Sequence, residues 1–211
     1  PTTTIERTET DLGWEFVQIY GLTETAPLIT INRNRAEFDN LSPTERAIKL
    51  SRAGAPSIGT TMDVDEHGEI MARSNTIMEG YWQQPDQTAM AIRDGFFHTG
   101  DSGIVDDDNY IVISDRKKDV IISGGENVSS IEVEDTLFQH PEIIEVAVIG
   151  IPDEKWGELV TALVVTSPES TVTEAEVIAF CKERLAGYKC PKKIEFRDEL
   201  ARTATGKLQK F

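Results

Sequence analysis

Hydrophobic and polar positions follow a more regular pattern in the second half of the chain than in the first. From about Ile111, short runs rich in β-branched residues alternate with segments of helical periodicity. The predicted strands cover residues 111–113, 120–122, 145–151, 159–166 and 193–196. With helices after the second and fourth of these strands, the pattern predicts a small α/β domain of roughly one hundred residues, whose sheet two helices cover.

Two capping signals mark where these helices begin. Ser129 precedes Glu132 by three residues, which is typical of a capping box, and this helix is expected to run to His140-Pro141. Thr171 and Glu174 have the same spacing and predict the start of the second helix. Its apolar stripe comprises Val177, Cys181 and Leu185, widened by Ile178 and Phe180.

The first hundred residues do not show the pattern of a self-contained domain. Residues 33–56 are polar and weakly periodic, and the strand-like run 68–72 stands isolated between turn residues. We therefore interpret residues 1–115 as the β-rich end of a larger domain and residues 116–211 as the small domain. The fold class is α/β (α+β), and a start at Pro1 without methionine leads us to expect an upstream domain of the same polypeptide.

Charge and composition exclude several classes of function. The formal net charge of −16 argues against binding to nucleic acid or to an anionic membrane surface. Basic residues cluster at 116–118, 189–193 and 202–210. These clusters could bind a small anion, or they could be solvated charges on the surface. The sequence has neither an apolar membrane-spanning stretch nor a signal peptide, so a cytoplasmic location is expected. Cys181 and Cys190 are interpreted as reduced structural thiols.

Residues 20–25, Tyr-Gly-Leu-Thr-Glu-Thr, are the first segment with candidate chemistry. They follow the apolar residues 16–19, as a glycine turn follows a strand. An aromatic ring suits a nucleotide base, a hydroxyl suits a phosphate oxygen, and a carboxylate suits a magnesium ion. A simple turn capped by a threonine is the alternative reading of these residues.

The second segment is Thr99-Gly100-Asp101. A carboxylate directly after a glycine can accept both hydrogen bonds of a ribose diol, although Thr-Gly-Asp is also an ordinary turn sequence. His98 stands beside it, but no serine or cysteine nearby offers a nucleophile. We therefore expect a partly packed histidine rather than a catalytic one.

Two further segments could meet a small anionic ligand. Arg116 stands at a predicted strand end, where its planar fork can bind ribose or phosphate oxygens, and the glycines Gly124 and Gly125 permit close approach of the backbone. Residues 201–210 form a glycine-hinged loop that could deliver a lysine onto a carboxylate and an α-phosphate. A basic tail is the alternative for this last segment.

In sequence order, these segments resemble those of the adenylate-forming superfamily of acyl-CoA synthetases, luciferases and peptide-synthetase adenylation domains. The resemblance is strongest to the fatty acyl-CoA ligases, extends from about Phe16 to Phe211, and is densest over residues 115–127. Other matching segments are Gly68-Glu69-Ile70, Gly80-Tyr81-Trp82, Pro152-Asp153-Glu154-Lys155-Trp156-Gly157-Glu158 and Thr205-Gly206-Lys207.

The resemblance implies a nucleotide-binding role for five residues. Tyr20 would stack on adenine, Thr23 would contact the α-phosphate, and Glu24 would ligate Mg²⁺. Asp101 and Arg116 would hold the ribose hydroxyls. ATP, its product AMP and Mg²⁺ are thus the implied nucleotides and metal.

The resemblance also implies an activity carried out in two steps. ATP would activate a carboxylic acid, of the fatty acid class, to an acyl-adenylate, and coenzyme A would then take the acyl group and release AMP. Lys207 would be the catalytic lysine of the first step. Lys118 would be the hinge of the small domain, and Gly124 and Gly125 would bind coenzyme A.

The sequence departs from the family pattern at three places. The family's glycine- and threonine-rich phosphate loop is absent from the 211 residues, so this chain alone is expected to be inactive. Ala201 replaces the usual proline of the last motif, and residues 59–69 are shorter than usual. An adenylation domain that loads a carrier protein, a luciferase-like oxygenase, and a non-catalytic fragment or binding module are the alternative functions.

Overall fold

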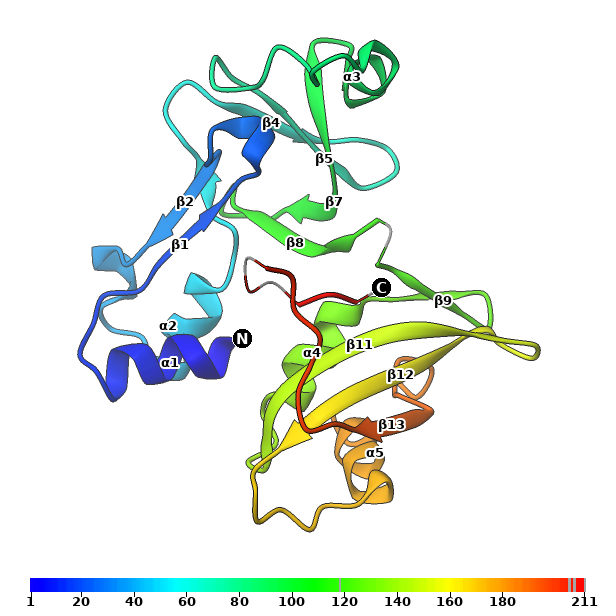
Figure 1. Ribbon diagram of the computed structural model, residues 1–211. Coiled ribbons are helices and arrows are strands. Elements are labelled where there is room, and N and C mark those ends of the chain that lie inside the picture. Colours follow the sequence, from blue (N-terminus) through cyan, green and yellow to red (C-terminus); the bar gives the residue numbers. More distant parts are fainter. Residues whose placement is uncertain (118, 205, 207, 211) are drawn as a thin grey trace. The chain divides into compact units, whose positions relative to one another are not determined.

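The chain divides into two compact units, and the boundary between them follows Lys117. The sequence pattern predicts this boundary two residues earlier, after residue 115. Unit 1 comprises Pro1–Lys117 and unit 2 comprises Lys118–Phe211. The structure, a computed structural model, describes residues 1–117, 119–204, 206 and 208–210 (Figure 1). Both units mix helices with largely antiparallel sheets, so the fold class is α/β in the broad sense.

Unit 1 begins with a small sheet and two helices. The antiparallel sheet has the order β1-β2-β3, formed by β1 (Val17–Tyr20), β2 (Thr30–Arg33) and β3 (Ala55–Pro56). Helices α1 (Thr2–Thr10) and α2 (Pro43–Leu50) lie side by side (Figure 1). They pack together through the buried side chains of Ile5, Ala47 and Leu50. The sequence pattern does not predict either helix, because each has a narrow apolar face: Ile5 is buried in α1, and Ala47 and Leu50 are buried in α2.

A second sheet completes unit 1. Its strand order is β4-β5-β7-β6, with β8 paired to β7. The members of this sheet are β4 (Thr61–Val64), β5 (Glu69–Arg73), β6 (Ile92–Arg93), β7 (Phe96–Val105) and β8 (Ile111–Arg116). Helix α3 (Pro85–Ala91) precedes β6. The run that looked isolated in the sequence is β5, which is central because it pairs with the distant β7.

Arg52, which follows α2, binds the loop that connects β7 with β8. Arg52 is buried and donates to the carboxylates of Asp106 and Asp108, at 2.7 Å each. Its guanidinium carbon lies 4.1 Å from the centre of the Tyr110 ring. A buried guanidinium needs such partners, because an unpaired charge inside a protein is costly.

Unit 2 is a five-stranded sheet with helices packed on it. The order is β10-β9-β12-β11, and β13 pairs in parallel with β12. The members are β9 (Ile121–Ser123), β10 (Glu126–Val128), β11 (Ile143–Asp153), β12 (Gly157–Thr166) and β13 (Lys193–Phe196). The strands β11 and β12 form a long twisted hairpin (Figure 1).

The core of unit 2 lies between this sheet and helices α4 (Ser130–Leu137) and α5 (Glu174–Lys182). Alternate strand residues point to the same face of a sheet. The side chains that meet the helices accordingly recur every second residue along β11 and β12: Val146, Val148, Val160, Ala162 and Val164. On the opposite face, Ala147, Val165 and Leu200 form a smaller cluster.

The two helix predictions of unit 2 need small corrections. Helix α4 starts after Ser129, whose hydroxyl accepts from the Glu132 amide, but it ends at Leu137, because a tight turn forms there and the His140 amide donates to the Leu137 carbonyl. For α5 the capping pair is Thr173 with Glu176, two residues later than predicted.

Helix α5 does not begin at the predicted pair Thr171 and Glu174, because the side chain of Glu174 makes a different contact. Glu174 accepts a hydrogen bond from the Ile194 amide at 2.9 Å, which ties the helix start to β13. Leu185 lies beyond the helix end but still packs against the core of unit 2.

Both cysteines are free thiols inside unit 2. Burial raises the pKa of Cys181 to about 12 and also raises the pKa of Cys190. These thiols therefore stay protonated at neutral pH, as expected for structural cysteines. Across the described residues, every helix is too short or too polar to cross a lipid bilayer.

Candidate functional site

A sharp turn after β1 presents the first group of predicted site residues. Gly21 can only be glycine there, because a Cβ atom would lie 2.0 Å from the carbonyl oxygen of Pro27. The following 3-10 turn, η1 (Thr23–Thr25), is stabilised by the buried Thr25, whose hydroxyl accepts from the Leu22 amide at 2.8 Å. Thr23 is exposed and Glu24 is half-buried on this turn.

Three predicted nucleotide-binding residues come together at the end of β1. The hydroxyl of Tyr20 donates to Oδ2 of Asp101 at 2.8 Å, although 81 residues separate them. Asp101 and Arg116 are register partners on β7 and β8, and Nε of Arg116 lies 3.5 Å from Oδ1 of Asp101. The carboxylate is buried, whereas the arginine side chain is 54% exposed.

These contacts define the electrostatics of the group. Burial raises the pKa of Tyr20, so its phenol stays a hydrogen-bond donor at neutral pH. Asp101 thus has a donor on one carboxylate oxygen and a cation near the other. The exposed arginine can change its side-chain conformation to meet an anion or a diol.

Glu24 has a partner that the sequence analysis did not single out as functional. The hydroxyl of Tyr81 donates to Oε1 of Glu24 at 2.9 Å, and the Met78 amide donates to the Glu24 carbonyl at 2.8 Å. Burial, and then the contact with Glu24, raise the pKa of Tyr81. The only signal in the sequence was the segment Gly80-Tyr81-Trp82, which matched the family without indicating a role.

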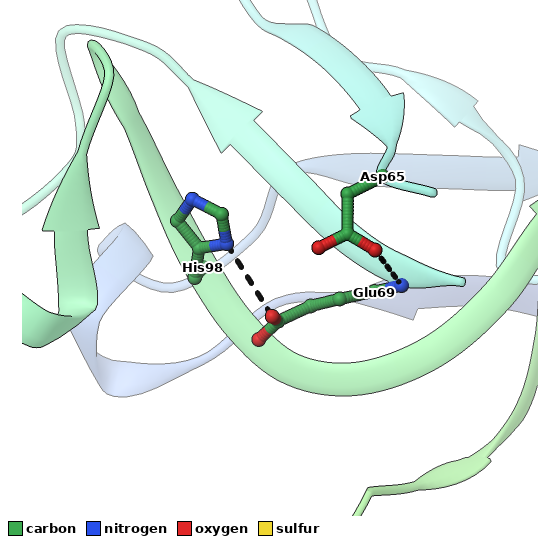
Figure 2. A group of neighbouring side chains, drawn as sticks. All are labelled: Asp65, Glu69 and His98. Atoms are coloured by element: carbon green, nitrogen blue, oxygen red, sulfur yellow. Dashed lines mark hydrogen bonds and ion pairs between the residues drawn. The ribbon is translucent and has the colours of Figure 1, made fainter. Parts of the chain in front are cut away.

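Asp65, Glu69 and His98 form a cluster of groups that could in principle bind a metal ion (Figure 2). Nδ1 of His98 lies 3.4 Å from Oε2 of Glu69, and the other ring nitrogen points away from both carboxylates (Figure 2). Lys117 and Arg93 already approach the same Glu69 oxygen, at 3.0 and 3.3 Å. Because two protein cations neutralise this carboxylate, the cluster favours an internal ion-pair network over a metal site.

In unit 2, Gly124 and Gly125 form the two-residue turn between β9 and β10. Both have positive φ angles, 63° and 85°, as a tight hairpin turn requires. The Gly124 amide donates to the Trp156 carbonyl at 2.7 Å, and a Cβ on Gly124 would lie 3.0 Å from the indole ring. A Cβ on Gly125 would meet no atom within 4 Å, so that residue borders open space.

Two predicted residues, Lys118 and Lys207, lie outside the described residues. The neighbours of Lys207 are held in place: Arg202 pairs with Leu208 in an isolated bridge, and its guanidinium donates to the Gly206 carbonyl at 3.0 Å. Arg202 also donates to Glu145 of β11 at 2.8 Å. Next to Leu208, Lys210 forms an ion pair with Glu134 of α4 at 2.7 Å.

Known proteins resemble this chain over almost its whole length. It is 45% identical to 4-hydroxybutyrate–CoA ligase 2 of Metallosphaera sedula, over 95% of the chain and 39% of that protein. It is 42% identical to 2-methylpropanoate–CoA ligase CCL4 of Humulus lupulus, over all of the chain and 41% of that protein.

A solved structure agrees with these relatives. ATP-bound MatB from Rhodopseudomonas palustris superposes with a TM-score of 0.87 and 33% identity, over 99% of this chain and 42% of that one. The chain thus spans about two fifths of the length of the proteins it matches. Residues 132–207 match the family of AMP-binding enzyme C-terminal domains. The chain therefore belongs to the adenylate-forming superfamily of AMP-binding enzymes, and it contains that family's C-terminal domain.

Proposed function

We propose that this chain is part of an ATP-dependent, AMP-forming acyl-CoA ligase. The observation that carries the proposal is the convergence of Tyr20, Asp101 and Arg116 in one unit of a chain from the AMP-binding superfamily. Its relatives are named as CoA ligases. Because the chain spans about two fifths of their length, the activity, the substrates and a cytoplasmic location are all part of the proposal.

The nucleotide is held by residues of unit 1. The ring of Tyr20 stacks on adenine, and Asp101 and Arg116 bind the ribose hydroxyls. Support comes from the Tyr20–Asp101 hydrogen bond, which fixes the carboxylate beside the aromatic ring, and from the exposed guanidinium next to it. Thr23, exposed on the adjacent turn, contacts the α-phosphate.

Glu24 is the residue that would hold Mg²⁺. Its carboxylate offers the hard oxygen ligands that this ion prefers, and no lysine or arginine of the described chain forms an ion pair with it. One oxygen accepts a hydrogen bond from Tyr81, and the residue is only half-buried. When bound, the ion supplies positive charge to the phosphate oxygens.

The reaction itself needs no protein nucleophile. A carboxylate oxygen of the acid forms a bond to the α-phosphorus of ATP while the bond to pyrophosphate breaks, and Lys207 offsets the negative charge that moves between them. The sulfur of coenzyme A then loses its proton and attacks the acyl carbonyl, and AMP leaves. Rotation about Lys118 exchanges the two faces of the small domain, and the turn at Gly124 and Gly125 lines the path of the thiol.

The geometry of the glycine turn supports this last assignment. Gly125 has no neighbouring atoms where a side chain would stand, so a narrow substrate arm can pass close to its backbone. A Cβ on Gly124 would be crowded by the indole ring of Trp156, at 3.0 Å. A turn that packs against Trp156 at Gly124 and borders open space at Gly125 is suited to lining a tunnel.

We propose a short aliphatic acid as the substrate, within the fatty acid class that the resemblance implied. Both ligases named above take their names from four-carbon acids, one hydroxylated and one branched.

The test is acid-dependent exchange of pyrophosphate into ATP, measured with short, medium and long fatty acids. The 211-residue chain should show no exchange, whereas a longer version that includes the rest of the ligase fold should exchange with four-carbon acids. Lys207→Ala in the longer version should reduce exchange by about a hundredfold or more, because it removes a charge aimed at the transition state.

The alternatives make different predictions for the same samples. Exchange followed by transfer to a carrier protein but not to coenzyme A would identify a carrier-loading adenylation domain. Absence of exchange in the longer version, with every acid tested, would contradict the ligase proposal and favour a non-catalytic binding module.

A further inference from the structure

The buried carboxylate of Glu69, at the start of β5, meets four hydrogen-bonding groups of unit 1. Only 8% of its side chain is exposed. Its oxygens receive Lys117 at 3.0 Å, Arg93 at 3.3 Å and the Gly100 amide at 3.0 Å, and His98 lies 3.4 Å away (Figure 2). Nothing in the reaction described above uses this residue.

Glu69 joins the middle of β7 to the residue that follows β8, and both of these strands carry site residues. Its Oε1 accepts from the Gly100 amide on β7, and its Oε2 accepts from Nζ of Lys117, directly after β8. The Lys117 amide in turn donates to the Gly100 carbonyl at 2.9 Å. Glu69, Gly100 and Lys117 thus form a closed triangle of hydrogen bonds.

This triangle lies directly beside the ribose-binding pair. Asp101 follows Gly100 along the chain, and Arg116 precedes Lys117. Asp101 and Arg116 are also register partners across β7 and β8, and a register irregularity follows at Ser102 and Gly103. The regular pairing of β7 with β8 therefore covers only two residue pairs before it is interrupted. The position of Asp101 and Arg116 thus depends on what fixes their chain neighbours Gly100 and Lys117.

The carboxylate is ionised in this setting. Burial by itself would raise the pKa of Glu69, but the hydrogen bonds from Lys117 and the Gly100 amide outweigh it and hold the pKa below its ordinary value. Charge-assisted hydrogen bonds are stronger than neutral ones. An ionised Glu69 is therefore a firmer anchor for Lys117 than a neutral amide of the same shape.

We propose that Glu69 is a positioning residue for nucleotide binding: through Gly100 and Lys117 it holds Asp101 and Arg116 at the separation that a ribose requires. This inference rests on the proposed function, since it presupposes that the two residues bind ribose. Glu69 itself contacts no substrate. Its loss should therefore weaken binding of ATP and AMP while leaving the chemical steps largely intact.

The experiment uses the longer ligase and two substitutions of similar shape. Glu69→Gln keeps an acceptor for the Gly100 amide but removes the charge that binds Lys117, and Lys117→Met removes the other partner. Each should raise the KM for ATP and the Kd for AMP about tenfold, the loss typical of one charge-assisted hydrogen bond, with kcat within about threefold of the wild type. The double variant should be no worse than either single variant by more than about twofold, because both remove one interaction.

Arg93→Met is the matched control. Arg93 contacts the same Glu69 oxygen but neither Gly100 nor Lys117, so its loss should leave both nucleotide constants unchanged. Additive effects of Glu69→Gln and Lys117→Met, or an equal effect of Arg93→Met, would overturn the proposal. Should Glu69→Gln fail to fold, Lys117→Met, at a side chain 40% exposed, still provides the test.

The experiments distinguish failure of the proposed ligase function from failure of the proposed role of Glu69. If the wild-type ligase shows no exchange with any acid, the proposed function fails before Glu69 is tested. If the wild type exchanges and the variants keep the wild-type KM and Kd, only the role of Glu69 is refuted.

Discussion

The two units of this chain differ in what holds their residues in place. Unit 2 has one continuous core that draws side chains from its sheet and from both of its helices. Unit 1 has two small clusters, Ile5 with Ala47 and Leu50, and Ala53 with Ile70 and Ile111. Apolar side chains on its β1-β2 hairpin remain exposed: Val17, Ile19 and Ile31.

In unit 1, polar contacts hold many of the strands and loops in place. Arg52 holds the β7-β8 hairpin through Asp106 and Asp108, and Glu69 holds Gly100 and Lys117. The candidate nucleotide-binding residues belong to this polar unit. A hydrophobic core fixes how elements pack, whereas directional hydrogen bonds fix the small separations between side chains that a ligand site needs.

The largest expected difference concerns independent folding. Residues 118–211 expressed alone should unfold cooperatively, with a stability of about 5 kcal/mol, because a single core is complete within them. Residues 1–117 alone should be only marginally stable, because their clusters are small. Thermal unfolding followed by circular dichroism checks both pieces, and a sharper or hotter transition for residues 1–117 would reverse the comparison.

Truncation of one buried leucine in each unit sharpens the contrast. Leu137→Ala, in the core of unit 2, should lower the free energy of unfolding by about 3 to 4 kcal/mol, because many fixed neighbours line the cavity. Leu50→Ala, in the three-residue cluster of unit 1, should cost about 2 kcal/mol, because its surroundings collapse more easily. Urea unfolding of both variants in the full chain measures the difference, and equal losses would contradict it.

Acid should destabilise unit 1 more than unit 2. Asp65, Glu69 and Asp106 have pKa values below the ordinary range, because hydrogen bonds and cations outweigh burial. A depressed pKa contributes stability that is present above the unfolded-state value and is lost as pH falls through the folded-state value. In unit 2, hydrogen bonds lower the pKa values of Glu176 and Glu195, but burial raises the pKa of Asp135, which works in the opposite direction.

Thermal unfolding between pH 7 and pH 3.5 checks this acid prediction. Unit 1 should lose on the order of 5 °C more than unit 2 over this interval, with Glu69→Gln reducing the difference. A larger acid loss in unit 2 would show that the polar network of unit 1 contributes little.

The smallest expected effect is the loss of a helix cap. Thr173→Ala should lower the stability of unit 2 by about 1 kcal/mol, because the hydroxyl of Thr173 caps the amide of Glu176. Thr171→Ala is the matched control and should change stability by less than about 0.5 kcal/mol. Ser42→Ala, which removes the equivalent cap of α2, gives the counterpart in unit 1.

The sequence by itself determined most elements of unit 2 and the family of the chain, but it did not predict β10, and it assigned the run 111–113, part of β8 of unit 1, to the small domain. The runs at 145–151, 159–166 and 193–196 lie inside or coincide with β11, β12 and β13, because their β-branched residues repeat with the period of a strand. Ser129 predicted the start of α4 correctly for a similar local reason. The segments that carried the resemblance were also local, and the comparisons with known proteins confirm the family.

Only the tertiary structure decided which side chains of unit 1 meet. Tyr20 bonds to Asp101, Glu24 to Tyr81 and Glu69 to Lys117 across 81, 57 and 48 residues of sequence. Such pairs depend on which strands become neighbours and in which register. A shift of one residue would turn the strand residues Tyr20, Glu69 and Asp101 to the other face of their sheets. Local patterns do not encode that register, so the sequence indicated the candidate residues while long-range strand pairing fixed their partners.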